Sequence, residues 1–229
     1  MPYLVAPAIP AGALAATGQP TLPVADRAVL RPWLLTDADA VREAFRDPAI
    51  QHWHVRRADS EAEARGWIET WRSEWPSERG AHWALVDAES DALLGRVALK
   101  SFDLQGGSAE LAYWTVPSAR GRGLCPRAAE AVTRWALYER GFHRIELEHA
   151  TANHASCRVA VKAGFEVEGI RRGAWLHADG RHDVHLHARI RSADAGVGVG
   201  VNAGTGAGTG AGADAGAGAG AGPAATAAG

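Results

Sequence analysis

The sequence predicts a single α+β domain, in which a central mixed, mostly antiparallel sheet of about seven strands is flanked by about four helices. Short runs rich in β-branched and aromatic residues alternate with amphipathic stretches that begin at recognisable helix caps. Consecutive strands occupy the middle of the chain, and strands separated by single helices follow. About 165 residues lie between two compositionally biased ends, which is enough to bury one core.

The first half of the chain carries a clear helix signal at Ser60-Glu61-Ala62-Glu63, which has the capping-box pattern. Trp67, Trp71 and Trp75 recur on one face of this helix, and this spacing indicates packing against the sheet. An earlier helix is expected over residues 36–45. The strands expected here are Val29–Trp33, His82–Val86, Leu93–Ser101 and Ala109–Val116.

In the second half, Pro126 suits the first turn of a helix that begins at Leu124, and Gly141 suits its C-terminal end. Asn153 is expected to cap a shorter helix that stops at Gly164. The remaining strands are Arg144–Ala150, Phe165–Ile170 and Val184–Ile190.

The two ends of the chain differ in composition from the middle. Residues 1–25 are rich in Ala and Pro and are expected to form a flexible lead-in. Residues 192–229 are almost entirely Gly and Ala, so they bury too little surface to offset chain entropy, and a disordered tail is expected. The folded domain is therefore assigned to residues 26–191.

Composition excludes several classes of protein. The formal net charge is −2, which supplies no basic field for nucleic acid. The chain has no long apolar run for a membrane span and no secretory signal, so a cytoplasmic protein is expected. Cys125 and Cys157 are expected to make neither a disulfide framework nor a four-ligand zinc site.

A metal site is not expected from the histidines near the C-terminal end of the domain. His185 and His187 share one strand face, but no further ligand set with a recognisable spacing accompanies them or the neighbouring His177 and His182.

The segment from Trp114 to Pro126 is the most informative in the chain. A strand leads into a loop with glycines at 121 and 123, and a helix follows, so backbone N–H groups and the helix dipole converge on one point. This arrangement suits a diphosphate, with Arg120 and Arg122 as mobile charged donors. The loop has no Gly-Lys-Ser/Thr ending, and Pro126 replaces the third glycine of a dinucleotide fingerprint.

Arg120-Gly121-Arg122-Gly123-Leu124-Cys125 resembles the Arg/Gln-x-x-Gly-x-Gly/Ala pyrophosphate motif of the GNAT superfamily of acyl-CoA N-acyltransferases, with Cys125 as the departure. The segment 153–165 is similar to the Asn-x-x-Ser-x-Arg-Val-x-x-Lys-x-Gly-Phe segment of the branch that contains ribosomal-protein N-terminal-alanine acetyltransferases. Leu30-Arg31-Pro32-Trp33 and His182-Asp183-Val184 fit the same branch, and the resemblance covers residues 27–191.

The resemblance implies a GNAT-like fold and acetyl-CoA as co-substrate. In this family the strand before the loop splays from its neighbour and pairs with the pantetheine amides, and the loop holds the diphosphate. The cofactor-binding residues so implied are Trp114, Thr115, Val116, Arg120, Gly121, Arg122, Gly123, Leu124, Cys125, Asn153, Ser156 and Arg158.

Two catalytic residues are expected for the reaction that the resemblance implies, Ser156 from the related branch and Glu110 from its place on the strand. Many family members protonate the leaving thiolate with a Tyr at the position of Ala160, and Ser156 is the substitute in the related branch; the alternative is that Ser156 only bonds its own backbone. Glu110 is expected to be the base, because strand alternation places it on one face with Ala112 and Trp114; the alternative is an exposed strand carboxylate.

The expected function is transfer of an acetyl group from acetyl-CoA to a primary amine by direct attack in a ternary complex. The acceptor is a protein or peptide N-terminus or a small amine, and homodimer formation is left open. His52 and His54 could face the acceptor, and Trp53, Trp83 and Trp175 could line its pocket. The alternative, kept open by Ala160, Ala174 and Cys125, is a non-catalytic acyl-CoA-binding module with the same fold.

Overall fold

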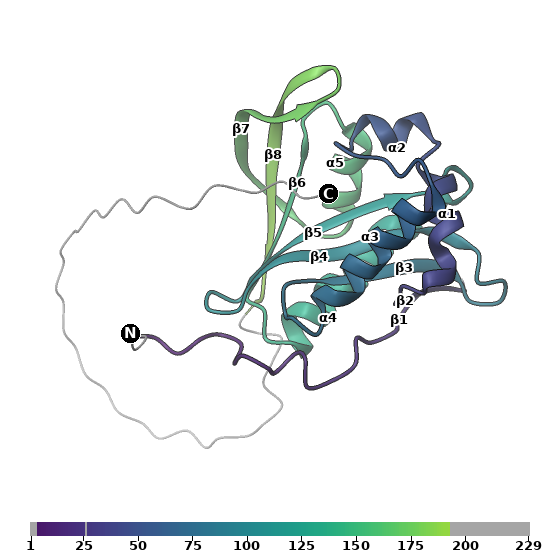
Figure 1. Cartoon of the computed structure of the whole chain (residues 1–229). Helices are drawn as coiled ribbons and strands as arrows, with labels where there is room; N and C mark the ends of the chain where they lie inside the picture. Colours follow the sequence, from purple (N-terminus) through teal and green to yellow (C-terminus); the bar gives the residue numbers. More distant parts are fainter. Residues whose placement is uncertain (1–3, 26, 193–229) are drawn as a thin grey trace, which may run out of the picture.

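The computed structural model describes residues 4–25 and 27–192, and its strands form a single sheet in the order β1-β2-β3-β4-β5-β6-β8-β7 (Figure 1). All neighbouring strands are antiparallel except β5 and β6, which are parallel. The strands are β1 (Leu22–Ala25), β2 (Ala28–Pro32), β3 (Ala81–Asp87), β4 (Leu93–Asp103), β5 (Ser108–Thr115), β6 (Arg144–Ala150), β7 (Glu166–His177) and β8 (Gly180–Ile190).

The helices cover both faces of this sheet and create two hydrophobic cores. One core joins α1 and α3 to the sheet and includes Trp71 and Trp114, and the other lies beneath α4 and includes Trp83 and Trp135. The predicted α+β class is confirmed, with one strand and one short helix beyond the expected numbers. The helices are α1 (Ala38–Ala44), α2 (Pro48–His52), α3 (Glu61–Glu74), α4 (Leu124–Glu139) and α5 (His154–Lys162).

Local signals at the helix ends are confirmed. Ser60 Oγ accepts from the backbone N–H of Glu63 (3.2 Å), and the Glu63 carboxylate accepts from the backbone N–H of Ser60 (3.3 Å), which completes the capping box of α3. Gly141 has a φ of +83° just beyond α4, a left-handed conformation that favours glycine. Trp71 and Trp75 are buried, so the tryptophan face of α3 packs as predicted.

The N-terminal segment differs from the prediction. Residues 8–25 pack along the domain instead of forming a flexible lead-in, with Ile9 and Leu14 each 2% exposed. The indole N–H groups of Trp75 and Trp83 donate to backbone carbonyls of this segment, both at 2.8 Å, and β1 extends the sheet at its edge. The prediction was wrong because it rested on the Ala/Pro composition and ignored two large apolar side chains that find tertiary partners.

The β7–β8 hairpin is also longer than predicted. Its pairing continues beyond the expected strand end at Ile170 as far as His177 and Gly180. Glycines and polar residues interrupt the alternation of this stretch, so its sequence hides the strands. Apart from Ser192, the predicted tail lies outside the described residues.

Within residues 4–25 and 27–192, no helix combines the length and apolar character needed to cross a bilayer.

Candidate active site

The parallel strands β5 and β6 separate after a short contact. Their register pairs are Ser108 with Arg144, Ala109 with Ile145 and Glu110 with Glu146, and no later pair joins the two strands in the described part of the chain. The β5 edge that faces β6 therefore carries backbone groups without a strand partner from Leu111 to Thr115. Such an edge can pair with the amides of an extended ligand, because unpaired backbone groups require hydrogen-bond partners.

The predicted phosphate loop lies at the end of β5 and leads directly into α4. Gly121 and Gly123 have φ values of +76° and +69°, which favour glycine and turn the chain sharply at this point. Gly123 occupies the N-cap position of α4 and offers no side-chain acceptor. The first N–H groups of α4 are thus available to an anion, which is the arrangement expected for a diphosphate site.

The arginines of this loop have different surroundings. The Arg120 guanidinium forms an ion pair with Asp47, the N-cap residue of α2, and also donates to the Thr115 carbonyl at 3.1 Å. Arg120 is therefore a tethered donor, in contrast to the mobile one expected. Arg122 is exposed, and its carbonyl accepts from Arg127 Nη2 at 2.9 Å. A ligand phosphate would meet Arg122 as a flexible charge and Arg120 as a charge already shared with Asp47.

Two other predicted loop residues contribute through their position. Leu124 is 1% exposed and anchors the start of α4 in the core. Burial raises the pKa of Cys125 to about 12, so its thiol stays protonated and acts as a packing group beneath the loop.

On the α5 side of the opening, Ser156 contacts a residue that the sequence analysis missed. The Tyr113 hydroxyl donates to the Ser156 carbonyl (3.1 Å) and lies 2.9 Å from Ser156 Oγ. The backbone N–H of Ser156 donates to Asn153 Oδ1 at 3.0 Å, which confirms the predicted cap. Strand alternation was the available signal, because it places Tyr113 on the face opposite Glu110 and Trp114. Burial raises the pKa of Tyr113, so the phenol remains a hydrogen-bond donor.

Glu110 lies on the other face of β5, toward α3. Its Oε1 atom is 3.0 Å from Lys100 Nζ of the neighbouring strand β4, and both side chains are partly exposed. Trp114 packs among the rings of Trp33 and Phe45 on the same face, as the predicted alternation requires. Glu110 is thus held by an ion pair and is not a freely solvated strand residue.

A group of rings stands on this side of the sheet, where the α2–α3 segment meets the β7–β8 hairpin. The Trp53 ring lies 5.6 Å from that of His177 and 5.8 Å from that of His182. His177 is 7% exposed, and neither of its ring nitrogens has a hydrogen-bond partner among the described residues. Burial lowers the pKa of His177, so its imidazole is neutral and keeps a free lone pair.

His54 and Trp175 also belong to this region, whereas Trp83 does not. His54 Nδ1 bonds the Ile50 carbonyl (2.8 Å), and burial lowers the His54 pKa to about 4. Trp175 lies 6.0 Å from His177. The expectation that Trp83 lines the acceptor pocket was wrong, since alternation along β3 turns it into the α4 core.

A buried polar chain supports the same face of the sheet. Glu74 Oε2 is 2.6 Å from His82 Nε2, and His82 Nδ1 is 2.8 Å from Arg96 Nη2. The Arg96 guanidinium also lies 4.6 Å from the ring centre of Trp71, and burial lowers the Arg96 pKa to about 10. These hydrogen bonds between Glu74, His82 and Arg96 hold β3 and β4 beneath α3, close to the Lys100–Glu110 pair.

The sequence model of the family described as acetyltransferase (GNAT) domain matches residues 27–166. The chain belongs to the GNAT family. The uncharacterized N-acetyltransferase YoaA of Bacillus subtilis (strain 168) is 23% identical to it over 167 residues, which are 72% of this chain and 94% of that protein. Ribosomal-protein-serine acetyltransferase of Escherichia coli (strain K12) is 28% identical over 102 residues, 44% of this chain and 57% of that protein.

Among solved structures, the fold is similar to that of RimL, the ribosomal L7/L12 alpha-N-protein acetyltransferase, in complex with coenzyme A. The TM-score is 0.71 at 20% sequence identity, and the match covers 76% of this chain and all of that one. The predicted family and fold are confirmed. The protein is a GNAT N-acetyltransferase, and it is related at low identity to ribosomal-protein acetyltransferases.

Proposed function

We propose that this GNAT enzyme acetylates the primary amine of a peptide or protein N-terminus by direct attack on acetyl-CoA in a ternary complex. The observation that supports this most is the separation of β5 from β6 beside the phosphate loop. The Tyr113–Ser156 pair stands on one side of the opening and Glu110 on the other. The two sides can thus serve the departing sulfur and the incoming amine separately.

In this proposal, the loop residues Arg120–Gly123 and the first N–H groups of α4 hold the diphosphate. The backbone of Trp114, Thr115 and Val116 pairs with the pantetheine amides, and a β5 N–H polarises the thioester carbonyl, a contribution of about 3–4 kcal/mol for one preorganised donor. Asn153, besides its cap, is placed at the start of α5 where it can bond the same arm, and the exposed Arg158 lies further along the same helix.

Proton handling is divided between the two faces. Glu110 accepts the amine proton, directly or through one water, as the nitrogen–carbon bond forms and the carbon–sulfur bond breaks. The Ser156 hydroxyl, held beside the Tyr113 phenol, donates a hydrogen bond to the sulfur as it leaves with its negative charge. His177 is a second candidate for the base. Its buried imidazole is neutral, and neither ring nitrogen has a hydrogen-bond partner among the described residues.

The acceptor class is proposed from two considerations. RimL and the E. coli relative are named as acetyltransferases of ribosomal proteins. The acceptor side of this enzyme is walled by neutral rings, including Trp53, Trp175 and His177, which suits an uncharged attacking amine. A small amine is the second candidate, favoured by the close approach of Trp53 to the β7–β8 hairpin.

The test is thiol release from acetyl-CoA with a panel of peptides of varied N-terminal residue, the same peptides with blocked α-amines, and small amines. Mass spectrometry identifies the acetylated nitrogen. Acetylation of free but not blocked peptides supports the proposal, and turnover confined to small amines replaces it with the second candidate. Acetyl-CoA binding without turnover on any amine contradicts both and favours the non-catalytic module.

A further inference from the structure

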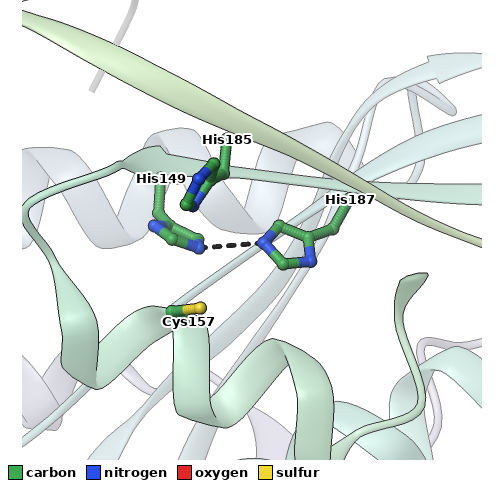
Figure 2. A group of neighbouring side chains, drawn as sticks. All are labelled: His149, Cys157, His185 and His187. Carbon is green, nitrogen blue, oxygen red and sulfur yellow. Dashed lines mark hydrogen bonds between the residues drawn. The ribbon is translucent and has the colours of Figure 1, made fainter. Parts of the chain in front are cut away.

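A cluster of nitrogen and sulfur ligands lies outside the proposed catalytic groups. Figure 2 shows His149, Cys157, His185 and His187 pointing toward a common centre. Each can offer one ligand atom, and these atoms all lie within 4.8 Å of one another. In the sequence, only His185 and His187 are recognisable as neighbours, since neither His149 nor Cys157 has a metal-ligand spacing to them.

The sheet register explains why these side chains meet. His149 of β6 is directly opposite His185 of β8, and His187 lies opposite Leu147, two positions along β6. Residues two apart on a strand share a face, so all three rings emerge on one side of the sheet. α5 lies over this side and contributes Cys157.

The hydrogen bonds within this cluster leave two buried histidine nitrogens without partners among the described residues. His149 Nε2 is 3.0 Å from His187 Nε2, and these residues are 3% and 0% exposed. The Nδ1 atoms of His185 and His187 are buried without a hydrogen-bond partner among the described residues. Buried polar atoms without partners are rare in native structures, so the Nδ1 atom of His185 is a nitrogen that could bind an ion.

The spacing suits a tetrahedral ion. Around zinc, nitrogen and sulfur ligands lie about 3.3–3.8 Å apart, given bond lengths of about 2.0–2.3 Å. The distance of 3.0 Å between His149 Nε2 and His187 Nε2 lies just below this range, and the upper limit of 4.8 Å between ligand atoms lies above it. Side-chain movements on the order of 1 Å would therefore bring the four ligand atoms to zinc-binding distances. Cys157 and His185 are partly exposed, which provides a path for the ion.

We propose that His149, Cys157, His185 and His187 bind one zinc ion in a closed four-ligand site. Thiolate and imidazole ligands favour zinc over the oxygen-seeking calcium and magnesium ions. His149 Nδ1 already contacts the Ala150 carbonyl at 2.8 Å, the outer-shell bond that presents Nε2 to a metal. Binding forms four metal–ligand bonds and releases the Cys157 thiol proton to solvent.

The site acts by positioning. Because four protein ligands fill the tetrahedron, no position remains for substrate or water. The ion instead ties α5 to β6 and β8, and α5 carries Asn153 and Ser156 beside the opening between β5 and β6. Zinc therefore fixes the helix that, with its N-cap residue Asn153, holds three of the proposed cofactor contacts, Asn153, Ser156 and Arg158.

The test uses the full chain without a histidine tag, stripped of metal by a chelator. Zinc is titrated against a chromophoric competitor, and Co²⁺ is added separately as a spectroscopic probe. We expect one saturable site per chain and a thiolate-to-cobalt charge-transfer band. Cys157→Ser removes the band and weakens zinc binding by more than about 100-fold, because even outer-shell changes cost 10–100-fold.

Matched controls are Cys125→Ser, which removes the other thiol, and His143→Gln, which changes an exposed histidine; both keep the band and the affinity. The proposal is overturned if zinc does not bind saturably, if cobalt shows no thiolate band, or if Cys157→Ser leaves both unchanged. Should Cys157→Ser fail to fold, the band of the unaltered protein decides. Metal binding is measured without acetyl-CoA, so its failure is distinct from failure of the proposed acetyl transfer.

Discussion

Gly123 allows the effect of charge at the phosphate loop to be separated from the effect of shape. Its φ is +69°, and a Cβ added there lies 3.6 Å from Arg127 Nη1, an ordinary contact. Gly123→Asn and Gly123→Asp carry the same backbone strain and nearly the same volume, and both residue types tolerate left-handed conformations better than most. The two variants differ by one negative charge at the proposed diphosphate site.

The size of the charge effect follows from distance. A carboxylate about 5 Å from a phosphate charge costs about 3 kcal/mol at an effective dielectric constant of about 20. Attraction to Arg127 and solvent screening act in the opposite direction, so we expect a difference of about 1–3 kcal/mol between the variants. This corresponds to about 5- to 150-fold weaker acetyl-CoA binding by Gly123→Asp than by Gly123→Asn.

The assay is calorimetric titration of both variants with acetyl-CoA at low and at high salt, after thermal melts have shown that both fold. The ratio of the two Kd values should shrink as salt increases, because screening weakens the added charge. Equal Kd values for the two variants at low salt would refute the assignment of this loop to the diphosphate.

Three further predictions concern catalysis, packing and pH. Glu110→Gln should lower kcat by about 10²- to 10⁴-fold while the Kd for acetyl-CoA stays unchanged, and an unchanged kcat would transfer the base role to another group such as His177. Leu14→Ala should lower the free energy of unfolding in urea by about 2–5 kcal/mol, because Leu14 is 2% exposed; a loss below about 0.5 kcal/mol would mean that the N-terminal segment does not pack on the domain. Burial lowers the pKa of His82 to about 4. Between that pH and about 6.5, the unfolded chain therefore binds more protons than the folded chain. The free energy of unfolding should fall by up to about 3 kcal/mol from this residue as the pH decreases through that window. His82→Gln should flatten this part of the stability profile, and parallel profiles for the variant and the unaltered protein would contradict the assignment.

Features encoded by neighbouring residues were predictable from the sequence. The capping box at Ser60 and the helix end at Gly141 depend on a few consecutive residues, and the structure contains both. The phosphate loop and the segment around Asn153 also indicated the family. Each motif is a short stretch of consecutive residues at the start of a helix that the sequence predicts.

Features that depend on distant segments were not predictable in this way. The direction of Trp83 requires knowledge of which face of β3 meets α4, and the burial of Leu14 requires partners far along the chain. The contact of Tyr113 with Ser156 joins β5 to α5 across the opening. The group formed by His149, Cys157, His185 and His187 depends on the β6–β8 register and on the placement of α5, which no local spacing encodes.

Direct titration with acetyl-CoA and with acetyl-pantetheine, which lacks the diphosphate and the nucleotide, tests the central claim most directly. If the loop after β5 and the first turn of α4 grip the diphosphate, acetyl-CoA binds saturably at one site per chain. Acetyl-pantetheine then binds at least about tenfold more weakly, since it loses the charge-assisted hydrogen bonds. No binding of acetyl-CoA to the folded protein, or equal affinity for both compounds, would contradict the account.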